Sequence, residues 1–453
     1  MRLVNCILFC NNKNKDTKDD TMAETFLNSF YSRNNKHYFK RITLSITIIV
    51  IFRILISFME PYSIDMAGYV AWSKYLAKHG PSQFYGSSGF HVVYAPFFQY
   101  FLWFTGEIAD LLSLTYGLHA FLIKLWSVLF EFIGAWLIFI IAEKAKKPRT
   151  GIVMAFLYLI NPGVCINSSV WGQFDSIPTT MLLGVITLFE YKKHNLAALL
   201  YLVAVLTKPQ SGLLLPVVIY LYFKGFKLDK KSLIRLATGL VSGLIIYYAI
   251  VLPFYIPTKL AYRLPEFIDP LYWLFELYFS RVQDYPFATA NAFNIWFLLG
   301  GQIQRDNLPF LGLSYFAWGN ILMAAALVYA FICLIKGKAS IYAITYFSYL
   351  VQFSAFFFMT KMHERYLLPA IIFIALASVF DEKNIFLFGL VSFSVFINHL
   401  YLYIISFEKV YWIERWDWLA LLFSFITLIT YILSIYRCYR AFLQPETLKG
   451  EVL

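Results

Sequence analysis

The sequence predicts an all-α integral membrane protein whose chain crosses the bilayer many times as helices. Of its 453 residues, 60% are hydrophobic and only 14% are charged, whereas a soluble domain carries about 25% charged residues. A chain this apolar cannot cover a water-facing surface. Its apolar residues also form long blocks without alternation, which favours helices over barrel strands, because a helix in lipid satisfies its own backbone hydrogen bonds.

The apolar blocks give the expected spans. At roughly 18–24 residues, the clearest blocks are long enough to cross a hydrocarbon core about 30 Å thick. They are residues 42–59, 119–142, 233–252, 314–335, 340–358, 385–405 and 418–436. Shorter or interrupted blocks lie at 96–113, 151–168, 176–190, 197–223 and 367–380. We therefore predict a polytopic bundle of about 10–12 transmembrane helices, with outer loops that carry short interfacial helices.

The charged residues predict the orientation of the chain. The formal net charge is +12, and the cations gather between apolar blocks, as they do in the cytoplasmic loops of membrane proteins. These basic stretches are residues 36–41, 144–149, 192–193, 224–231, 336–338 and 437–440. Because the positive charge is concentrated in these loops, we predict a cytoplasmic N-terminus. The same placement argues against a nucleic-acid partner.

One membrane domain is expected over residues 42–440, between cytoplasmic tails at 1–41 and 441–453. The first tail is polar and rich in Asn, Lys and Asp, which predicts disorder, and Met22 is a second candidate start. Residues 1–10 are too short and too poorly flanked for a signal peptide, so the first apolar block is expected to be a retained anchor.

Counting spans from a cytoplasmic N-terminus assigns each polar stretch to a side. The outer stretches are residues 60–95, 171–175, 208–210, 253–290, 361–366 and 408–417. One basic loop conflicts with this count, because two spans at 96–113 and 119–142 would place residues 144–149 outside, against their charge. Either 96–113 is re-entrant or this loop breaks the rule.

The first outer loop carries a candidate carboxylate, Asp65. Ionisable groups near a membrane are functional candidates, because burying them is costly unless they are paired or hydrated. Residues 66–79 are amphipathic enough for a short helix on the membrane surface. Asp65 is therefore either a functional carboxylate or the N-cap of that helix. Tyr94 ends the same loop.

The second motif is the cluster Trp171, Gln173 and Asp175, which follows the helix breakers Pro162 and Gly172. Aromatic rings stack on sugar faces, while amide and carboxylate groups bind hydroxyls, so this cluster is typical of carbohydrate sites. The alternative is an interfacial tryptophan beside a helix N-cap aspartate.

Two further motifs interrupt apolar stretches. Lys208 followed by Pro209 predicts a broken helix that lines a cavity, or else a lysine that snorkels at the end of a span. Asn291 and Asn294 are expected to share one face of a helix, where they either line a cavity or cap the helix after the Pro-rich loop.

The fifth motif, residues 361–366, opens a span with four ionisable side chains. Arg365 offers a planar fork that suits a phosphate or a carboxylate, and Lys361 and His363 are expected to add positive charge beside Glu364. The alternative is an interfacial anchor.

In this order the motifs resemble those of GPI mannosyltransferases, which are polytopic glycosyltransferases of the GT-C superfamily, and they are similar to enzymes of the PIG-M and ALG types. The matching strings are Trp-Gly-Gln-Phe-Asp-Ser at 171–176, Lys-Pro at 208–209, Asn-Ala-Phe-Asn-Ile-Trp at 291–296 and Lys-Met-His-Glu-Arg-Tyr at 361–366. The positions of Asp65, Tyr69, Trp72, Tyr94 and Pro96 look like the first outer loop of that family. The resemblance covers about residues 42–380.

The chain also departs from the family pattern. Val93 stands before Tyr94, where an acidic residue is common, and Ala95 replaces a proline. No Asp-x-Asp pair surrounds Asp65, so the sequence predicts no particular cofactor and gives no support to a divalent metal.

The resemblance implies an enzyme that transfers a mannosyl or other hexosyl group from a polyprenyl- or dolichyl-phosphate donor, on the non-cytoplasmic face and with inversion. The acceptor would be a glycan, a lipid or a protein. The sequence agrees, because it has no Gly-rich phosphate loop and no Rossmann-like pattern for a nucleotide sugar.

The implied roles divide the candidate residues into three groups. Asp65 would be the general base, with Asp175 as the rival. Arg365, His363 and Lys208 would hold the donor phosphate. The sugar or acceptor would be bound by Trp171, Gln173, Asn291, Asn294, Glu364 and Tyr94.

The competing prediction is a lipid or glycolipid transporter or flippase. Such proteins often show inverted repeats and charges in mid-span, and neither is clear in this sequence. The expected location is the plasma membrane if the source is prokaryotic and the endoplasmic reticulum membrane if it is eukaryotic.

Overall fold

The computed structural model describes residues 36–82, 84–86, 89–92, 94–258 and 265–444. It falls into two compact units, Met1–Ile48 and Ile49–Leu453. The described part of the first unit is the beginning of helix α3, which spans Lys36–Ser57. All of the predicted site residues belong to the second unit.

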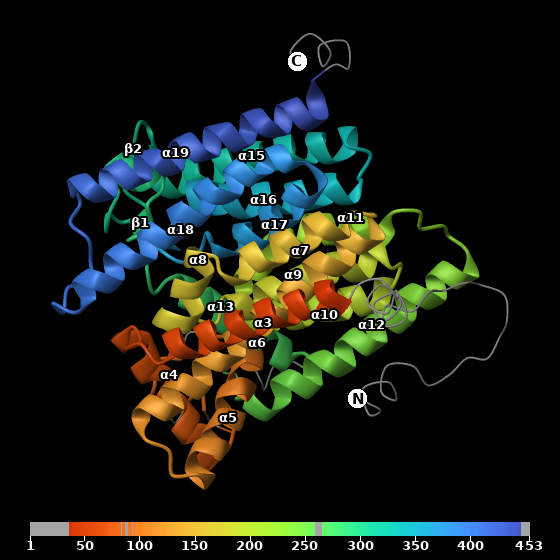
Figure 1. Ribbon diagram of the computed structural model, residues 1–453. Helices are drawn as coiled ribbons and strands as arrows, with labels where there is room; N and C mark the ends of the chain where they lie inside the picture. The colour runs from red at the N-terminus through yellow and green to blue at the C-terminus, as the bar shows by residue number, and fades with distance from the viewer. Residues whose placement is uncertain (1–35, 83, 87–88, 93, 259–264, 445–453) are drawn as a thin grey trace. The chain divides into compact units, whose positions relative to one another are not determined.

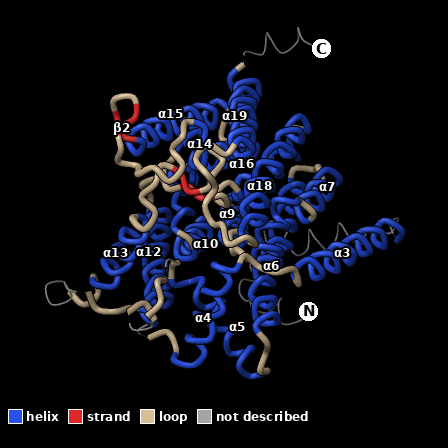
Figure 2. The backbone as a smooth tube through the Cα atoms, turned by 90° about the vertical axis from the view of Figure 1, so that its left-hand side faces the viewer, coloured by secondary structure: helices blue, strands red, loops and turns tan. Residues whose placement is uncertain are grey.

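The structure is 74% helical, which confirms the all-α prediction, and Figure 2 shows helix almost throughout, with only short strands. After α3, the helices of the first half are α4 (Ser63–His79), α5 (Pro96–Leu111), α6 (Tyr116–Lys144), α7 (Pro148–Leu159), α8 (Pro162–Cys165), the π-helix η1 (Ile166–Trp171), α9 (Ser176–Glu190), α10 (His194–Thr207), the 3-10 helix η2 (Pro209–Leu214) and α11 (Leu215–Phe223).

The second half continues with α12 (Lys230–Val251), η3 (Leu252–Phe254), α13 (Asp269–Val282), α14 (Ile295–Leu298), α15 (Tyr315–Lys336), α16 (Ile341–Phe358), α17 (Leu368–Phe380), η4 (Glu382–Asn384), α18 (Ile385–Ser406), α19 (Trp418–Cys438) and η5 (Tyr439–Leu443). Figure 1 labels most of these elements.

A multi-pass membrane protein is confirmed by the length and apolar composition of these helices. In the described chain, six segments are able to cross a bilayer: Tyr116–Lys144, Lys230–Phe254, Tyr315–Lys336, Ile341–Phe358, Glu382–Ser406 and Trp418–Leu443. The pair Pro148–Leu159 and Pro162–Trp171, bent by 42°, makes a seventh if it counts as one span. Shorter apolar helices are Ser176–Glu190, His194–Thr207, Pro209–Phe223 and Leu368–Phe380. The number of 10–12 spans stays a prediction.

Three predicted boundaries need correction or qualification. Helix α3 begins at Lys36, before the predicted end of the first tail at residue 41, and residues 1–35 lie outside the described ones. The apolar block 197–223 is two helices that meet at Lys208. The π-helix η5 reaches Leu443, and residues 445–453 of the second tail lie outside the described ones.

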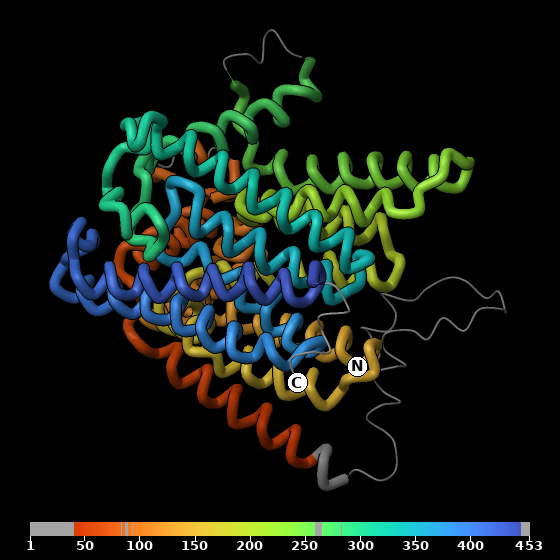
Figure 3. The backbone as a smooth tube through the Cα atoms, turned by 90° about the horizontal axis from the view of Figure 1, so that it is seen from above, coloured from red at the N-terminus to blue at the C-terminus, as the bar shows by residue number. Residues whose placement is uncertain are grey.

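Close helix packing depends on small residues, as is common between transmembrane helices. A Cβ atom on Gly151 of α7 would lie 2.3 Å from the Cβ of Ala142 on α6. A Cβ atom on Gly106 of α5 would lie 2.2 Å from the carbonyl oxygen of Ser73 on α4. These glycines let α7 approach α6 and let α5 lie against α4. Farther along the chain, α16 packs on α15, α17 and α19, and Figure 3 shows α15, α16 and α19 running side by side.

Two small sheets order the outer loops. Strand β1 (Thr289–Ala290) pairs in parallel with β4 (Met362–His363), so that Thr289 faces Met362 and Ala290 faces His363. Strands β2 (Pro309–Phe310) and β3 (Leu313–Ser314) form an antiparallel hairpin. The first pairing fixes the fifth motif against the end of the Pro-rich loop.

The basic loops gather at one end of the second unit. The Nζ atom of Lys147 donates to the carbonyl of Phe380 over 2.8 Å, and Arg437 pairs with Asp381. The Nζ atom of Lys144 lies 3.2 Å from Oε1 of Glu190. The loop of residues 144–149 therefore lies with the other basic loops, as its charge predicts.

Candidate active site

The candidate residues meet around two adjoining cavities. The larger has a volume of ≈ 490 Å³. Its lining includes Asp65, Tyr94, Gln210, Arg281, Tyr285, Lys361, His363, Arg365 and Tyr366. The smaller has a volume of ≈ 30 Å³ and is lined by Asp175 and Lys208, among others. Gln210 and Tyr366 line both cavities.

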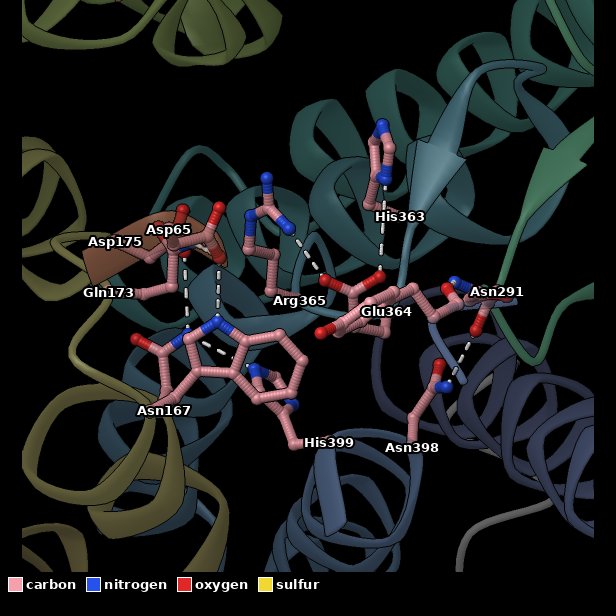
Figure 4. A network of polar contacts seen from close by, with 12 residues as sticks. Asp65, Asn167, Gln173, Asp175, Asn291, His363, Glu364, Arg365, Asn398 and His399 are labelled. Atoms are coloured by element: carbon pink, nitrogen blue, oxygen red, sulfur yellow. Dashed lines mark hydrogen bonds and ion pairs between the residues drawn. The ribbon is translucent and has the colours of Figure 1, made fainter. Parts of the chain in front are cut away.

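Asp65 faces the larger cavity from the first turn of α4. The N-cap of this helix is Tyr62, and no side chain caps it, so the helix-cap alternative for Asp65 is wrong. Its Oδ2 atom accepts hydrogen bonds from Nε1 of Trp171 over 2.8 Å and from Nε2 of Gln173 over 2.5 Å (Figure 4). Among the described residues, no hydrogen bond engages Oδ1, which leaves that oxygen available to a ligand.

The break in the second apolar block aims Trp171 and Gln173 at Asp65. The π-helix ends at Gly172, whose φ of 93° favours glycine. The carbonyl of Asn167 accepts from the backbone N–H groups of Gly172 and Gln173, over 3.1 and 2.9 Å. This turn brings side chains two residues apart to the same carboxylate.

Trp171 is a buried anchor rather than an interfacial residue. Its side chain is 0% exposed and stacks on Tyr62 at a centroid distance of 4.0 Å. Neither Trp171 nor Gln173 lines either cavity. Both were predicted to bind sugar or acceptor, but in the structure they hold the candidate base.

The amide of Gln173 is itself oriented by a tyrosine. Tyr69 donates its hydroxyl hydrogen bond to Oε1 of Gln173 over 2.9 Å, and its oxygen lies 3.2 Å from the hydroxyl of Tyr94. Because Oε1 accepts from Tyr69, the NH₂ group of the amide faces Asp65. Tyr94, which was predicted to bind sugar or acceptor, lines the larger cavity.

Asp175 and Lys208 form a buried ion pair. Helix α10 ends at Thr207 and η2 starts at Pro209, so the predicted break in the helix is confirmed. Lys208 is 3% exposed and does not snorkel. Asp175 stands at the N-cap position of α9, yet its side chain makes no cap hydrogen bond.

The charge of Lys208 makes Asp175 a weak base. Burial alone would raise the pKa of Asp175, but the Lys208 ammonium and the Arg365 guanidinium hold that pKa below its ordinary value. Burial lowers the pKa of Lys208, and the Asp175 carboxylate opposes this. Asp175 also accepts a 3.3 Å hydrogen bond from Asn167 and lies outside the lining of the larger cavity.

Arg365 follows strand β4 and points toward Glu364 in Figure 4. Its Nη1 atom donates to Oε1 of Glu364 over 2.5 Å, and its Nε atom has no hydrogen-bond partner among the described residues. Burial raises the pKa of Glu364, although Arg365 opposes the shift. Glu364 was predicted to bind sugar or acceptor, but it lines neither cavity and instead supports the guanidinium.

His363 lines the larger cavity as a neutral side chain. Burial, together with the charges of Arg365 and Lys208, lowers its pKa well below the ordinary value. This shift disfavours the positive charge that the sequence led us to expect at this position. A neutral imidazole can still hydrogen-bond a ligand oxygen through its N–H group.

The asparagine pair supports the backbone and does not line either cavity. Asn291 has φ 62° and is not helical, so the expected shared helix face is wrong. Its side chain donates to the carbonyl of Tyr411 over 2.9 Å and accepts from Gln302 over 2.8 Å. Asn294 caps α14 through the N–H groups of Trp296 and Phe297, as its capping alternative predicted.

Sequence reasoning missed a second buried ion pair, Arg53 with Glu131. Nη2 of Arg53 also donates to Ser168 over 2.7 Å, and Ser176 donates to Glu131 over 2.6 Å. Both charges lie inside apolar blocks, and an ionisable residue within a span is the signal that could have found them.

His399 was missed for a similar reason, since it lies with Asn398 inside an apolar block. Its Nδ1 atom lies 2.8 Å from the carbonyl of Val395, and its Nε2 atom lies 3.0 Å from Nδ2 of Asn167. Nδ1 is then the donor and Nε2 the acceptor. The neutral imidazole holds the amide that in turn contacts Asp175 (Figure 4).

No group of three or more His, Cys, Asp or Glu side chains that could hold a metal ion occurs within the described residues. In comparisons of the sequence with family models and with curated proteins, no family model and no curated protein matches.

Proposed function

We propose that this protein is a membrane glycosyltransferase that moves a hexosyl group, of the mannosyl type, from a polyprenyl- or dolichyl-phosphate donor to an acceptor. The observation that carries the proposal is the lining of the larger cavity. It combines one carboxylate, Asp65, with the three cationic side chains Arg281, Lys361 and Arg365. A base and a phosphate-binding surface within one cavity are what this reaction requires.

The reaction follows from these groups. Oδ1 of Asp65 takes the proton of the acceptor hydroxyl, and the acceptor oxygen forms a bond to the anomeric carbon of the donor. The bond from that carbon to the phosphate oxygen breaks, and its electron pair leaves with the lipid phosphate. The anomeric configuration inverts because attack and departure occur on opposite faces.

Charge in the cavity supports the departing phosphate. The guanidinium of Arg365 is held by Glu364 through Nη1 and lines the larger cavity, and no described residue hydrogen-bonds its Nη2 atom, so it retains capacity to bind an anion. Lys208 was expected to share this role, but its ammonium is paired with Asp175. Lys361 and Arg281 line the larger cavity and replace it in the proposal. Their ion pairs, with Asp306 at 3.6 Å and with Asp284 at 4.0 Å, are longer and less buried than that of Lys208.

The test uses the purified protein with a panel of polyprenyl- and dolichyl-phosphate sugars, and it measures labelled sugar transferred and lipid phosphate released. Removing a general base should lower turnover by roughly 10²–10⁴-fold, so Asp65→Asn should nearly abolish transfer. The matched control is Asp110→Asn, an exposed aspartate of α5. Near-full turnover of Asp65→Asn would eliminate the base assignment.

The phosphate role has its own variant. Removing a group that stabilises developing charge typically costs about 10²–10³-fold in kcat. The kcat for sugar transfer by Arg365→Ala should therefore fall by a factor of that size. Arg149→Ala, an exposed arginine at the opposite, basic end, is the matched control. Equal activity of the two variants would remove Arg365 from the mechanism.

The second candidate function is a lipid or glycolipid transporter. The buried pair Arg53 and Glu131 favours it, because intramembrane charges often mark transport pathways. Reconstituted vesicles with a labelled lipid-phosphate sugar distinguish the two candidates. Movement of intact lipid across the bilayer without release of lipid phosphate would support transport and contradict transfer.

A further inference from the structure

The smaller cavity lies between helices, and several polar side chains interrupt its mostly apolar wall. Its lining combines the charged pair Asp175 and Lys208 with neutral polar side chains that include Thr179, Gln210 and Gln352. Apolar residues such as Leu182 and Phe356 complete the wall. Polar groups from α9, η2 and α16 therefore converge on one small space.

Several of these polar atoms lack a partner among the described residues. Oγ1 of Thr179 and Oε1 of Gln210 are buried without a hydrogen bond. Gln352 is 3% exposed, lies within the candidate span Ile341–Phe358, and makes no hydrogen bond to a described residue. A buried amide or hydroxyl without a partner is costly, and a polar group that enters the cavity would offset that cost.

The size of the cavity limits that partner. A volume of ≈ 30 Å³ holds about two atoms of the size of a water oxygen, since one water needs about 10–15 Å³ by this measure. That space suits a hydroxyl or a hydroxymethyl group, but not a phosphate or a lipid chain. The carboxylate of Asp175 also disfavours an anion.

The position of the cavity indicates where the partner comes from. Gln210 and Tyr366 line both cavities, so a ligand bound beside Asp65 and Arg365 has the smaller cavity next to it. Hydroxyl groups both donate and accept hydrogen bonds, as the mixed lining of amide, hydroxyl, carboxylate and ammonium requires.

We propose that the smaller cavity is a subsite that receives one hydroxyl or hydroxymethyl group of the transferred sugar, bound by Gln352 and Thr179 beside Asp175. This inference rests on the proposed function. It assigns sugar specificity to two side chains that the resemblance does not include.

The test compares the parent lipid-phosphate sugar with donors that each lack one hydroxyl. In the wild type, one deoxy donor should lose about tenfold in kcat/KM, because a buried site left unpaired discriminates by roughly that factor. In Gln352→Met and in Thr179→Val, the difference in kcat/KM between that deoxy donor and the parent should shrink to about twofold, because the side chain that binds the hydroxyl group is gone.

Matched controls keep the test specific. Gln99→Met on α5 and Thr187→Val on α9 replace buried residues of the same kinds that line neither cavity, and they should keep the full gap. A thermal melt of each variant identifies loss of folding. Because Gln352→Met and Thr179→Val change different helices, one variant still tests the subsite if the other does not fold.

Two results would overturn the subsite. Equal use of every deoxy donor by the wild type would show that no hydroxyl is recognised. An unchanged gap in both folded test variants would show that the cavity holds water only. The same donors are also compared by equilibrium binding, which requires no transfer. If one deoxy donor binds more weakly than the parent but no sugar is transferred, the proposed function is contradicted and the subsite stays supported. If all donors bind equally and no sugar is transferred, both proposals are rejected.

Discussion

Replacing Lys208 by methionine should strongly destabilise the protein, because it leaves the carboxylate of Asp175 buried without its counter-charge. Both side chains of this pair are 4% exposed. Removing one partner of a buried ion pair costs about 3–5 kcal/mol, since the remaining charge cannot be solvated. Methionine preserves the length of the side chain, so the expected loss comes from charge and not from a cavity.

The measurement is reversible unfolding in mixed micelles by titration with a denaturing detergent. The double variant that combines Lys208→Met with Asp175→Asn should recover most of the lost stability, because no charge is then buried. Lys144→Met is the matched control, since Lys144 and Glu190 form an exposed pair. Its loss should be about 1 kcal/mol or less.

The pH dependence gives an independent check. The pKa of Asp175 is lowered in the wild type, so its stabilising contribution is present above the ordinary aspartate pKa of about 4 and is lost as pH falls through the lowered pKa. Without Lys208, burial should raise this pKa, and stability should then fall as pH rises. The difference from the wild type should therefore widen between about pH 4 and pH 7. A pH-independent loss, or one below about 1 kcal/mol, would refute the reasoning.

Three further variants test how the site is positioned. Tyr69→Phe removes the hydroxyl that orients Gln173, so turnover should fall about tenfold with unchanged donor binding. An equal loss of turnover and of donor affinity would indicate a purely structural role. Asn294→Ala should cost about 2 kcal/mol in detergent unfolding, from a lost helix cap and a lost hydrogen bond, and should retain transfer. Gly172→Ala should destabilise by at least about 1–2 kcal/mol, because φ is 93° and a methionine methyl carbon lies 2.3 Å from the added Cβ. Transfer lost in the asparagine variant, or wild-type stability in the glycine variant, would contradict these assignments.

The sequence predicts which segments meet at the site better than it predicts what each side chain does there. Asp65, Gln173 and Arg365 stand out because polar residues interrupt long apolar blocks. The structure places Asp65 and Arg365 in the lining of one cavity, and Gln173 contacts Asp65 from outside that lining. The sequence does not show that Gln173 contacts Asp65, because that hydrogen bond joins residues 108 positions apart. The turn at Gly172 brings Gln173 to Asp65. The sequence alone does not give the φ angle of that turn, because the folded chain determines it.

The asparagine pair shows a different limit. A spacing of three residues places two side chains on one face only if the backbone is helical. Asn291 instead pairs with His363 across a bridge and has a positive φ. Local spacing could not reveal this, because strand β4, which lies far along the chain, imposes the geometry.

The direction of α5 bears on the conflict over the basic loop at residues 144–149. Phe98, near its start, stacks on Phe174 beside the site at 3.6 Å, while Thr105, farther along, accepts from Trp126 of α6 over 2.8 Å. The next residue of α6, Ser127, donates to the carbonyl of Gln173.

The chain therefore leaves the level of the site along α5 and returns along the first part of α6. Only the rest of α6 continues to Lys144 at the basic end. Helix α5 is not among the candidate spans of the described chain. If α5 is re-entrant and the shorter apolar helices after α6 cross the bilayer, every basic stretch from residue 144 onward falls on one side, as the positive-inside rule expects. The direction of α5 therefore favours the re-entrant alternative for 96–113, and the number and sidedness of the crossings stay predictions.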